Sequence, residues 1–362
     1  MANVRRRICM IVQQKDVRGG IAAVTSGYYG SALESTYDIR YVESYCNGSK
    51  FQKLIKAIKG IIEFRKVLRE FKPELVHMHT SFGPSFYRMQ PFLYLAKKQG
   101  IPVIDHLHGA DFKTFYIDAS NKKKKLIKKV YNDFSKIIVL SKEWEDTMSE
   151  VVPREKLTVI ENYCMPQDIK TIECLIGDRF RDKQILFLGE IGKRKGGYDF
   201  AAIVKKTLAK VPDAVFMFCG SGAKADVDDI VYDVYSVAGK EHAVFPGWLR
   251  GEAKEKVLRE SAVYMLPSYD EGLPMSILDA MSYGLPVVST NVGGIPKVVR
   301  AGVNGFLSEP GDTDSISTGL AKLLSDKDMY IRAARKSYEI ADKEYNFEVH
   351  LEKLKKTYDE FL

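Results

Sequence analysis

The sequence is poor in cysteine and tryptophan, and it has no long hydrophobic run. Five cysteines are spread over 362 residues without a Cys-x-x-Cys pair, which argues against a disulfide framework or a cysteine-rich zinc site. No apolar stretch approaches the roughly 18 residues of a membrane-spanning helix. The apolar stretch after Arg5–Arg7 ends by Val12, too short for the core of a signal peptide. We therefore expect a cytoplasmic protein.

The composition is that of an ordinary globular chain. Hydrophobic residues make up 45% and charged residues 28%, which excludes a disordered or fibrous protein. The length is two to three times that of a usual domain, so two domains are expected.

The net positive charge comes from the first half of the chain. Residues 1–170 carry 29 Lys and Arg against 18 Asp and Glu, whereas residues 171–362 carry 26 against 29. A basic half of this kind is typical of a protein that meets nucleic acid, an anionic membrane surface or a phosphorylated substrate.

Short apolar runs alternate with amphipathic stretches along the whole chain. Because the runs are continuously apolar and separated by helix-length segments, they predict parallel strands covered on both faces. The predicted strands are residues 8–12, 75–79, 102–107, 137–140, 157–160, 185–188, 214–219, 243–246, 262–266, 286–289 and 305–307. The fold class is therefore α/β, with two Rossmann-like, doubly wound domains.

The helical periodicity lapses around Met165-Pro166, which suggests a domain boundary there. We expect an N-terminal domain over 1–168 and a C-terminal domain over 183–344, with an amphipathic helix over 345–362 packing back on the first. Ligands of such domains bind at the carboxyl ends of the strands, so the chemistry is expected in the cleft between the domains.

Two glycine-containing loops follow predicted strands and are candidate anion sites. Gly189 opens the stronger one, which continues to Arg194-Lys195 and Gly196-Gly197 before a helix. The three consecutive cations, Lys193 to Lys195, together with backbone N–H groups at the start of a helix, favour binding of a phosphate. Gly19-Gly20 opens a helix after the first strand and is a weaker candidate, because such a pair is often only a turn.

Two carboxylates surround the start of another predicted helix. Glu271 lies in the loop before it and Asp279 about a turn and a half inside, so both can address one ligand. Carboxylates accept hydrogen bonds from the hydroxyls of a sugar or ribose.

Two further patterns leave alternatives open. Residues 220–225 fit the Gly-x-Gly-x-x-Ala fingerprint of a dinucleotide site, although acidic residues crowd the following helix. The triplets Asp226-Val227-Asp228 and Asp312-Thr313-Asp314 could hold a divalent metal, but their place at helix starts favours capping.

The order and spacing of these segments resemble the GT-B retaining glycosyltransferases of family 4 over nearly the whole chain. The matching segments are Gly19-Gly20-Ile21, His106-Leu107-His108-Gly109, Arg194-Lys195-Gly196, Cys219-Gly220-Ser221-Gly222, Phe245-Pro246-Gly247-Trp248-Leu249, Glu271-Gly272-Leu273-Pro274, Gly293-Gly294-Ile295-Pro296 and Asn304-Gly305-Phe306.

The resemblance assigns roles to individual residues. Arg194 and Lys195 would hold the donor diphosphate, and Asp279 the ribose hydroxyls. Glu271 would address the donor sugar and the reacting centre. His108 would approach the sugar, and Gly272, Leu273 and Pro274 would lie beside it. Gly189 would belong to the phosphate loop, and Gly19 and Gly20 to a loop that closes on the phosphates. The residues beside the base would be Gly222, Gly247, Trp248 and Leu249.

Three positions depart from the family pattern. The second carboxylate is Asp279, one methylene shorter than the usual Glu, and Glu190 stands where an arginine often follows the phosphate-loop glycine. Lys297 replaces the frequent acid after Gly-Gly-x-Pro. Arg194 is expected to supply the charge missing at position 190.

The implied function is transfer of a hexose from a nucleotide sugar, UDP favoured over GDP, to a hydroxyl of a glycan or lipid-linked saccharide in cell-surface polysaccharide synthesis. Neither a cofactor nor a metal ligand is expected, nor a nucleic-acid partner. A noncatalytic nucleotide-sugar-binding protein and a GT-B nucleotide-sugar epimerase remain as alternatives.

A basic helix over 50–70 predicts peripheral attachment to the inner face of the cell membrane. Its apolar positions, from Phe51 to Ile62, are expected to pack inward while Lys50, Lys53, Lys56 and Lys59 face an anionic surface. Lys122–Lys125 would add a second cationic cluster.

Overall fold

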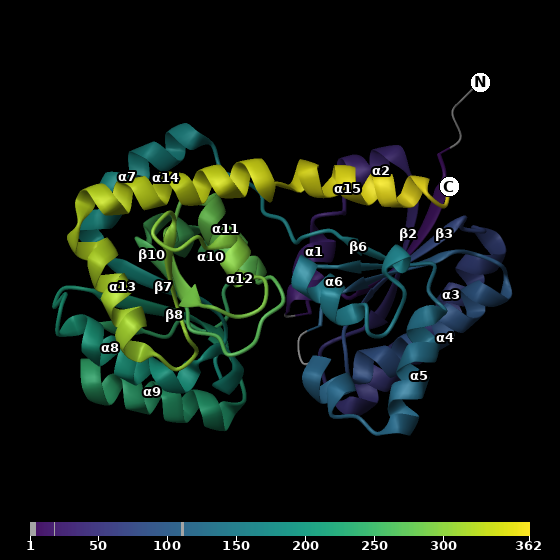
Figure 1. Ribbon diagram of the computed structural model, residues 1–362, viewed down its shortest axis with the longest axis horizontal. Helices are drawn as coiled ribbons and strands as arrows, with labels where there is room; N and C mark the ends of the chain where they lie inside the picture. The colour runs from purple at the N-terminus through teal and green to yellow at the C-terminus, as the bar shows by residue number, and fades with distance from the viewer. Residues whose placement is uncertain (1–4, 18, 110–111) are drawn as a thin grey trace. The chain divides into compact units, whose positions relative to one another are not determined.

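A computed structural model describes residues 5–17, 19–109 and 112–362, and these form two compact units. The first unit comprises the chain up to Asn162 together with Glu348–Leu362, and the second is Tyr163–Phe347. Each unit is a parallel sheet flanked by helices (Figure 1). The second unit thus starts before residue 183, because the helix α7 (Ile169–Asp182) belongs to it.

The first unit contains a six-stranded parallel sheet in the order β2-β1-β3-β4-β5-β6. Its strands are β1 (Arg7–Gln13), β2 (Asp38–Tyr45), β3 (Leu75–Thr80), β4 (Val103–Leu107), β5 (Lys136–Val139) and β6 (Leu157–Val159). Its α-helices are α1 (Gly20–Ser26), α2 (Ala32–Thr36), α3 (Lys50–Glu70), α4 (Pro84–Lys98), α5 (Asn121–Asn132), α6 (Lys142–Met148) and α15 (Phe347–Asp359), whose first residue lies at the unit boundary.

The second unit repeats this arrangement with the order β12-β11-β10-β7-β8-β9. Its strands are β7 (Gln184–Glu190), β8 (Val215–Ser221), β9 (Ala243–Val244), β10 (Val263–Leu266), β11 (Val287–Thr290) and β12 (Gly305–Ser308). Besides α7, its α-helices are α8 (Phe200–Leu208), α9 (Lys224–Ala238), α10 (Gly251–Glu260), α11 (Met275–Ser282), α12 (Ile295–Val298), α13 (Thr313–Ser325) and α14 (Lys327–Glu344).

These two sheets confirm the α/β class and the doubly wound topology. All six strands expected in the second unit are present. Strands β10 and β11 are fully buried and β7 and β8 largely so, whereas β9 and β12 are short and partly exposed. In the first unit β2 is a strand that the apolar pattern does not predict. This edge strand carries Asp38, Arg40 and Glu43, so it lacks the continuous apolar character of a central strand.

Helix α3 has the expected bounds but the opposite rotation about its axis. Phe51 and Ile62 have exposed fractions of 70% and 61%, and the side that faces the sheet carries Gly60, Phe64 and Leu68. A Cβ atom at Gly60 would lie 2.7 Å from the carbonyl oxygen of Glu43, so the helix backbone packs tightly against β2 there. The expectation that the apolar face packs inward is therefore wrong, because close approach at glycine determines which side is buried.

A buried arginine anchors α7 in the second unit. Arg179 donates from Nε to the carbonyl oxygen of Arg259 at 2.5 Å, and from its two terminal nitrogens to those of Tyr283 at 2.7 Å and Leu258 at 3.3 Å. These carbonyls lie at the C-terminal ends of α10 and α11, where helices lack internal donors and carry partial negative charge. Residues 169–182, which lie outside both predicted domain ranges, are thus an integral part of the second unit.

Candidate active site

The loop after β7 forms a single turn, Lys193–Lys195. This turn contains Arg194 and Lys195, the two cations predicted to hold the diphosphate. The turn ends at Gly196, whose φ is +73° and whose Cβ position lies 2.1 Å from the carbonyl oxygen of Pro267. Only glycine combines that backbone conformation with so close an approach. The turn is therefore held against the segment that follows β10.

Glu271, in the loop after β10, is where the predicted cations converge. Its Oε1 atom forms an ion pair with Nζ of Lys195 and accepts a hydrogen bond from the Ser268 hydroxyl at 2.8 Å. A guanidinium nitrogen of Arg194 lies 3.7 Å from the same oxygen. The Lys195 and Glu271 side chains are only 11% and 7% exposed, so this charge pair lies largely out of solvent.

Backbone contacts hold three strand-end loops together around Glu271. Arg194 donates to the carbonyl oxygen of Asp270 at 3.1 Å, and the Tyr269 amide donates to the carbonyl oxygen of Arg194 at 2.8 Å. After β11, Gly293 has φ +53° and a Cβ position 1.8 Å from the Glu271 carbonyl oxygen. The adjacent Gly294 amide donates to Gly272 at 2.6 Å. The carboxylate is thus positioned by its main chain as well as by its cations.

Asp279 has a different cation. Its Oδ2 atom lies 2.5 Å from Nζ of Lys254 on α10, and its side chain is 23% exposed. Gly272, Leu273 and Pro274 lead from Glu271 into α11, which carries Asp279. The structure therefore brings Arg194, Lys195 and Glu271 into contact and pairs Asp279 separately, as expected if the two carboxylates address different parts of a ligand.

The residues assigned to the base follow β8 and β9. Gly222 directly follows β8, and a Cβ atom there would lie 1.9 Å from the carbonyl oxygen of Ile191. Gly247, with φ +83°, precedes the half-buried Trp248 and Leu249. Because β7, β8, β9 and β10 run parallel, these loops leave the same end of the sheet as the cationic turn. Gly189 was expected to open the phosphate loop, but it lies within β7 and pairs with Gly220 of β8.

The remaining predicted residues belong to the first unit. His108 directly follows β4, and its Nε2 atom lies 2.9 Å from Nδ1 of His79. Burial lowers the pKa of His108 to about 3, so its imidazole is neutral. Gly19 has φ +137° and precedes Gly20, the first residue of α1.

Comparison with known proteins connects this geometry to a family. Residues 177–340 match the family described as "Glycosyl transferases group 1", and residues 21–164 match "Glycosyltransferase Family 4". The chain belongs to the GT-B glycosyltransferases of family 4. It is a glycosyltransferase.

Relatives of this glycosyltransferase include a galactosyltransferase, and solved structures share its fold. It is 27% identical over 353 residues to the UDP-Gal:alpha-D-GlcNAc-diphosphoundecaprenol alpha-1,3-galactosyltransferase of Escherichia coli, covering 92% of this chain and 86% of the relative. The solved structure of sucrose-phosphate synthase from Thermosynechococcus elongatus matches with a TM-score of 0.80 at 15% identity, covering 98% and 99% of the two chains. HepE of Anabaena in complex with UDP-glucose matches with a TM-score of 0.70 at 16% identity, covering 98% and 99%.

The alternative motifs of the glycosyltransferase have structural roles. Asp226, after the Gly-x-Gly segment, accepts a hydrogen bond from the Tyr198 hydroxyl at 2.9 Å. Asp312 caps α13 by accepting from the Ser315 amide at 2.9 Å, and Asp314 pairs with Lys206 at 2.7 Å. Within the described residues, neither acidic triplet is part of a cluster of three metal-ligating side chains.

A group of buried histidines in the first unit was not predicted from the sequence. His77 and His79 on β3 lie beside His106 on β4, and none of the three is exposed. The His-x-His spacing at His77 and His79 and again at His106 and His108 could have predicted this group, because alternate residues of a strand point to one face of the sheet.

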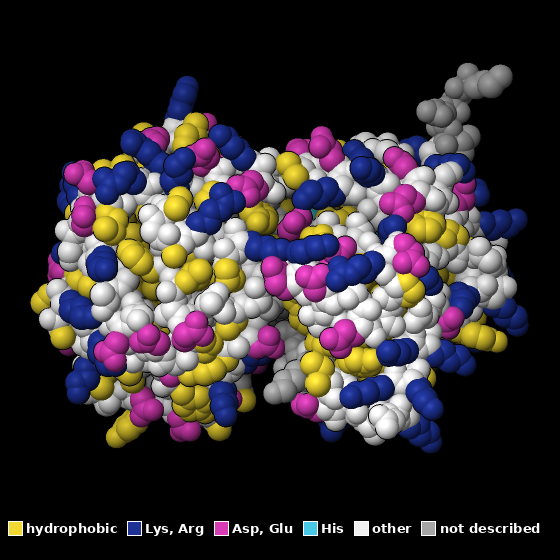
Figure 2. All heavy atoms as spheres, viewed as in Figure 1, with side chains coloured by type: hydrophobic (Ala, Val, Ile, Leu, Met, Phe, Trp, Pro, Cys, Tyr) yellow, Lys and Arg dark blue, Asp and Glu magenta, His cyan; other side chains and the backbone are white. Residues whose placement is uncertain are grey.

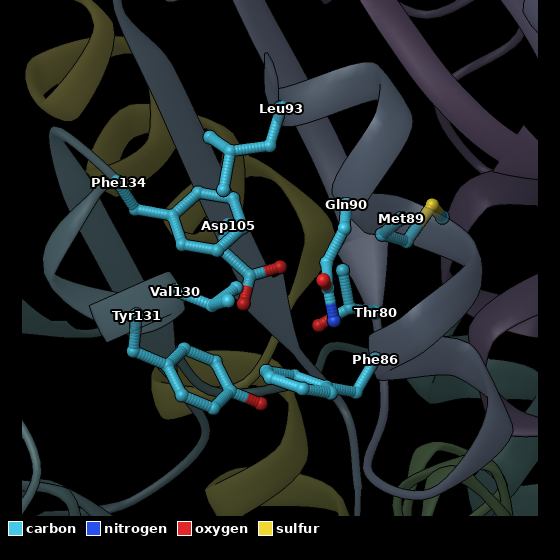
Figure 3. A pocket seen from close by; sticks show the side chains of 9 residues that line it. All are labelled: Thr80, Phe86, Met89, Gln90, Leu93, Asp105, Val130, Tyr131 and Phe134. Carbon is cyan, nitrogen blue, oxygen red and sulfur yellow. The ribbon is translucent and has the colours of Figure 1, made fainter. Parts of the chain in front are cut away.

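A cavity on the opposite face of that sheet is too small for a sugar. It encloses about 10 Å³, room for a single water molecule. The Asp105 carboxylate points toward Gln90 and Thr80 (Figure 3). Burial raises the pKa of Asp105 to about 7. This cavity therefore belongs to the packing of α4 and α5 and not to the glycosyltransferase site.

Proposed function

We propose that this protein transfers a hexose from a UDP-sugar to a hydroxyl of a glycan or lipid-linked saccharide, with retention of anomeric configuration and without a metal ion. The observation that carries the proposal is the convergence of Lys195 and Arg194 on Glu271 at the carboxyl ends of β7 and β10. Cations held beside a sugar-binding carboxylate are what departure of a nucleoside diphosphate requires.

The donor proposal draws on the relatives and on the loops around the site. The Escherichia coli relative is named for UDP-Gal, and the Anabaena neighbour is a complex with UDP-glucose. In this chain, Asp279 would accept hydrogen bonds from the ribose hydroxyls, and Gly222 with Gly247–Leu249 would border the base. Lys254, now paired with Asp279, keeps that carboxylate oriented.

The proposed mechanism relies on prepositioned charge. As the glycosidic bond breaks, negative charge grows on the departing diphosphate, and each well-placed donor lowers the barrier by about 3 to 4 kcal/mol. Lys195 has three N–H donors, one of which faces Glu271, so the others can address phosphate oxygens. Arg194 adds a fork of donors that matches a phosphate.

The acceptor hydroxyl would attack on the face from which the diphosphate leaves. The departing phosphate takes the acceptor proton, so no protein nucleophile is needed. Glu271 would stabilise the positive charge that develops on the sugar. His108, neutral at physiological pH, would hydrogen-bond the sugar from the first unit, and the loop at Gly19-Gly20 would close over the phosphates.

The direct test is transfer from a panel of UDP- and GDP-hexoses to a polyprenyl-diphosphate-linked saccharide and to a free glycan, in excess EDTA. We expect one UDP-hexose to yield product, and NMR of the new linkage to give the anomeric configuration of the donor. Binding of UDP without transfer to either acceptor would indicate a noncatalytic protein. An inverted linkage would refute retention, and activity restored only by Mg²⁺ or Mn²⁺ would refute metal independence.

We further propose that the first unit docks on the inner face of the cell membrane, which would bring it to a lipid-linked acceptor in surface polysaccharide synthesis. An exposed apolar row on α3 supports this proposal. The row consists of Phe51, Leu54, Ile55, Ile58 and Ile62. Lys50, Lys59 and Lys66 flank it, so α3 combines apolar side chains for the acyl boundary with cations for anionic lipid headgroups.

Neighbouring helices extend this basic surface. Helix α4 packs beside α3 and exposes Tyr94, an aromatic suited to a membrane interface. Helix α5 adds the run Lys122–Lys125. Lys and Arg side chains gather along the side where α3, α4 and α5 lie (Figures 1 and 2). Among the described residues, no helix combines the length and hydrophobicity that a membrane crossing requires.

A further inference from the structure

Five of the six histidines of the chain gather on one face of the first sheet. His77 and His79 alternate along β3, and the parallel pairing of β3 with β4 sets His79 opposite His106. The ring centroids of His77 and His79 are 4.4 Å apart, and those of His79 and His106 are 5.1 Å apart. His108 follows on the same side, and His350 contributes from α15.

Hydrogen bonds orient two of these rings through one nitrogen and leave the other nitrogen available. Nδ1 of His77 lies 2.6 Å from the Tyr358 hydroxyl, and Nδ1 of His79 lies 2.9 Å from Nε2 of His108. Nε2 of His77, Nε2 of His79 and both ring nitrogens of His106 are buried without a partner among the described residues. Leaving a buried polar nitrogen unpaired is unfavourable, so this concentration of free nitrogens points to a ligand.

We propose that His77, His79 and His106 bind a zinc ion through these free nitrogens. One nitrogen from each ring can be chosen so that the three lie within 4.8 Å of one another. Zinc bonds imidazole nitrogen at about 2.0 to 2.1 Å, which separates tetrahedral ligands by about 3.3 Å.

The chemistry of the three side chains favours a first-row transition metal over Mg²⁺ or Ca²⁺. The donors are nitrogens, whereas Mg²⁺ and Ca²⁺ prefer oxygen. Tyr358 and His108 occupy the outer nitrogens, as the second shell of a zinc–histidine site does.

The ligands belong to the first unit, whereas Arg194 and Lys195 belong to the second. The zinc ion would join β3 to β4 and, through Tyr358, fix α15 on the sheet. It is therefore expected to stabilise the first unit and to take no part in departure of the diphosphate.

The test is zinc binding by the full chain after removal of metal with a strong chelator and dialysis. We expect about one equivalent of Zn²⁺ per chain, measured by elemental analysis, and a rise in Tm that saturates at that ratio. Replacing Zn²⁺ by Co²⁺ should produce the visible absorption bands of a cobalt ion with nitrogen ligands. Absence of stoichiometric uptake by the wild-type protein would overturn the proposal.

Two variants and one control locate the site. His106→Gln should weaken zinc binding by more than about 100-fold, and Tyr358→Phe, which removes one hydroxyl and keeps the ring, by about 10- to 100-fold. His242→Gln is the matched control, because His242 is the one histidine outside the cluster and belongs to the second unit. Equal affinity in all four proteins would place the zinc elsewhere and contradict the assignment, and the Tyr358→Phe result stands even if His106→Gln fails to fold.

Discussion

At the scale of single residues, the two carboxylates of the second unit have different surroundings. Glu271 is enclosed by Lys195, Ser268 and the main chain of Gly293, whereas Asp279 is more open and pairs with Lys254. The sequence singles out both carboxylates and the two cations that we propose for the diphosphate. It does not predict that Lys195 contacts Glu271, because their spacing along the chain says nothing about which loops meet.

The different surroundings predict different effects of neutralising each carboxylate. Asp279→Asn should weaken binding of free UDP, since the ribose loses a charged acceptor. Glu271→Gln should leave UDP affinity near wild type and lower kcat, because the negative charge beside the sugar and the reacting centre is removed. Calorimetric titration with UDP and steady-state kinetics separate the two effects. Unaltered UDP affinity in Asp279→Asn would refute the ribose assignment.

Gly293 tests how strictly the Glu271 loop is positioned. Gly293→Ala would place a methyl group against the Glu271 carbonyl oxygen and should reduce both kcat and the free energy of unfolding. Gly302→Ala is the matched control, because Gly302 also has positive φ but nothing within 4 Å of its Cβ position. Denaturant unfolding should show Gly293→Ala to be about 1 to 3 kcal/mol less stable than Gly302→Ala. Equal stability and activity would mean that the loop yields easily.

At the scale of secondary-structure elements, periodicity predicts where a helix lies better than which way it faces. Helix α3 begins and ends where the pattern indicates, but the close contact of Gly60 with β2 turns its apolar row outward. Strand β2 was missed for a related reason, since an edge strand can carry charges on its open side. Both outcomes depend on tertiary contacts that a local pattern does not contain.

The exposed row on α3 predicts membrane binding that needs apolar and cationic side chains together. Wild-type protein should co-sediment with anionic liposomes. The double variant Phe51→Ser with Ile58→Ser should lose that binding. The triple variant Lys50→Glu with Lys59→Glu and Lys66→Glu should also lose it, because each lysine near an anionic surface contributes about 1 kcal/mol to binding. Tyr232→Ser, at an exposed aromatic residue of the second unit, is the control. Equal binding by all four proteins would exclude this docking surface. So would wild-type binding to neutral liposomes that equals its binding to anionic liposomes.

Helix α7 predicts a large stability effect from one side chain. Arg179→Met keeps an apolar stem but removes the donors to three helix-terminal carbonyl oxygens, so the free energy of unfolding should fall by about 3 kcal/mol or more. Arg181→Met, on the same helix with a side chain 73% exposed, should change it by less than about 0.5 kcal/mol. Chemical denaturation of the two variants decides, and similar losses would contradict the capping role.

At the scale of the whole molecule, the two units divide the proposed work. The first carries the positive charge, the exposed row of α3, the histidines and His108, and the second carries the cations for the leaving group and both carboxylates. The sequence predicts this division because parallel strands and their following loops are local features. The histidine cluster escaped prediction because it depends on the pairing of β3 with β4 and on a helix from the end of the chain.

The central claim is that Lys195 and Arg194 stabilise the departing diphosphate, and the rate of transfer tests it most directly. With the UDP-hexose that proves active, Lys195→Ala and Arg194→Ala should each lower kcat by about 100-fold or more. Lys193→Ala, an exposed cation in the same turn, should remain close to wild type. If Lys195→Ala and Arg194→Ala both keep the wild-type kcat, the leaving-group assignment is wrong, and a loss of kcat in Lys193→Ala would then identify Lys193 as the cation.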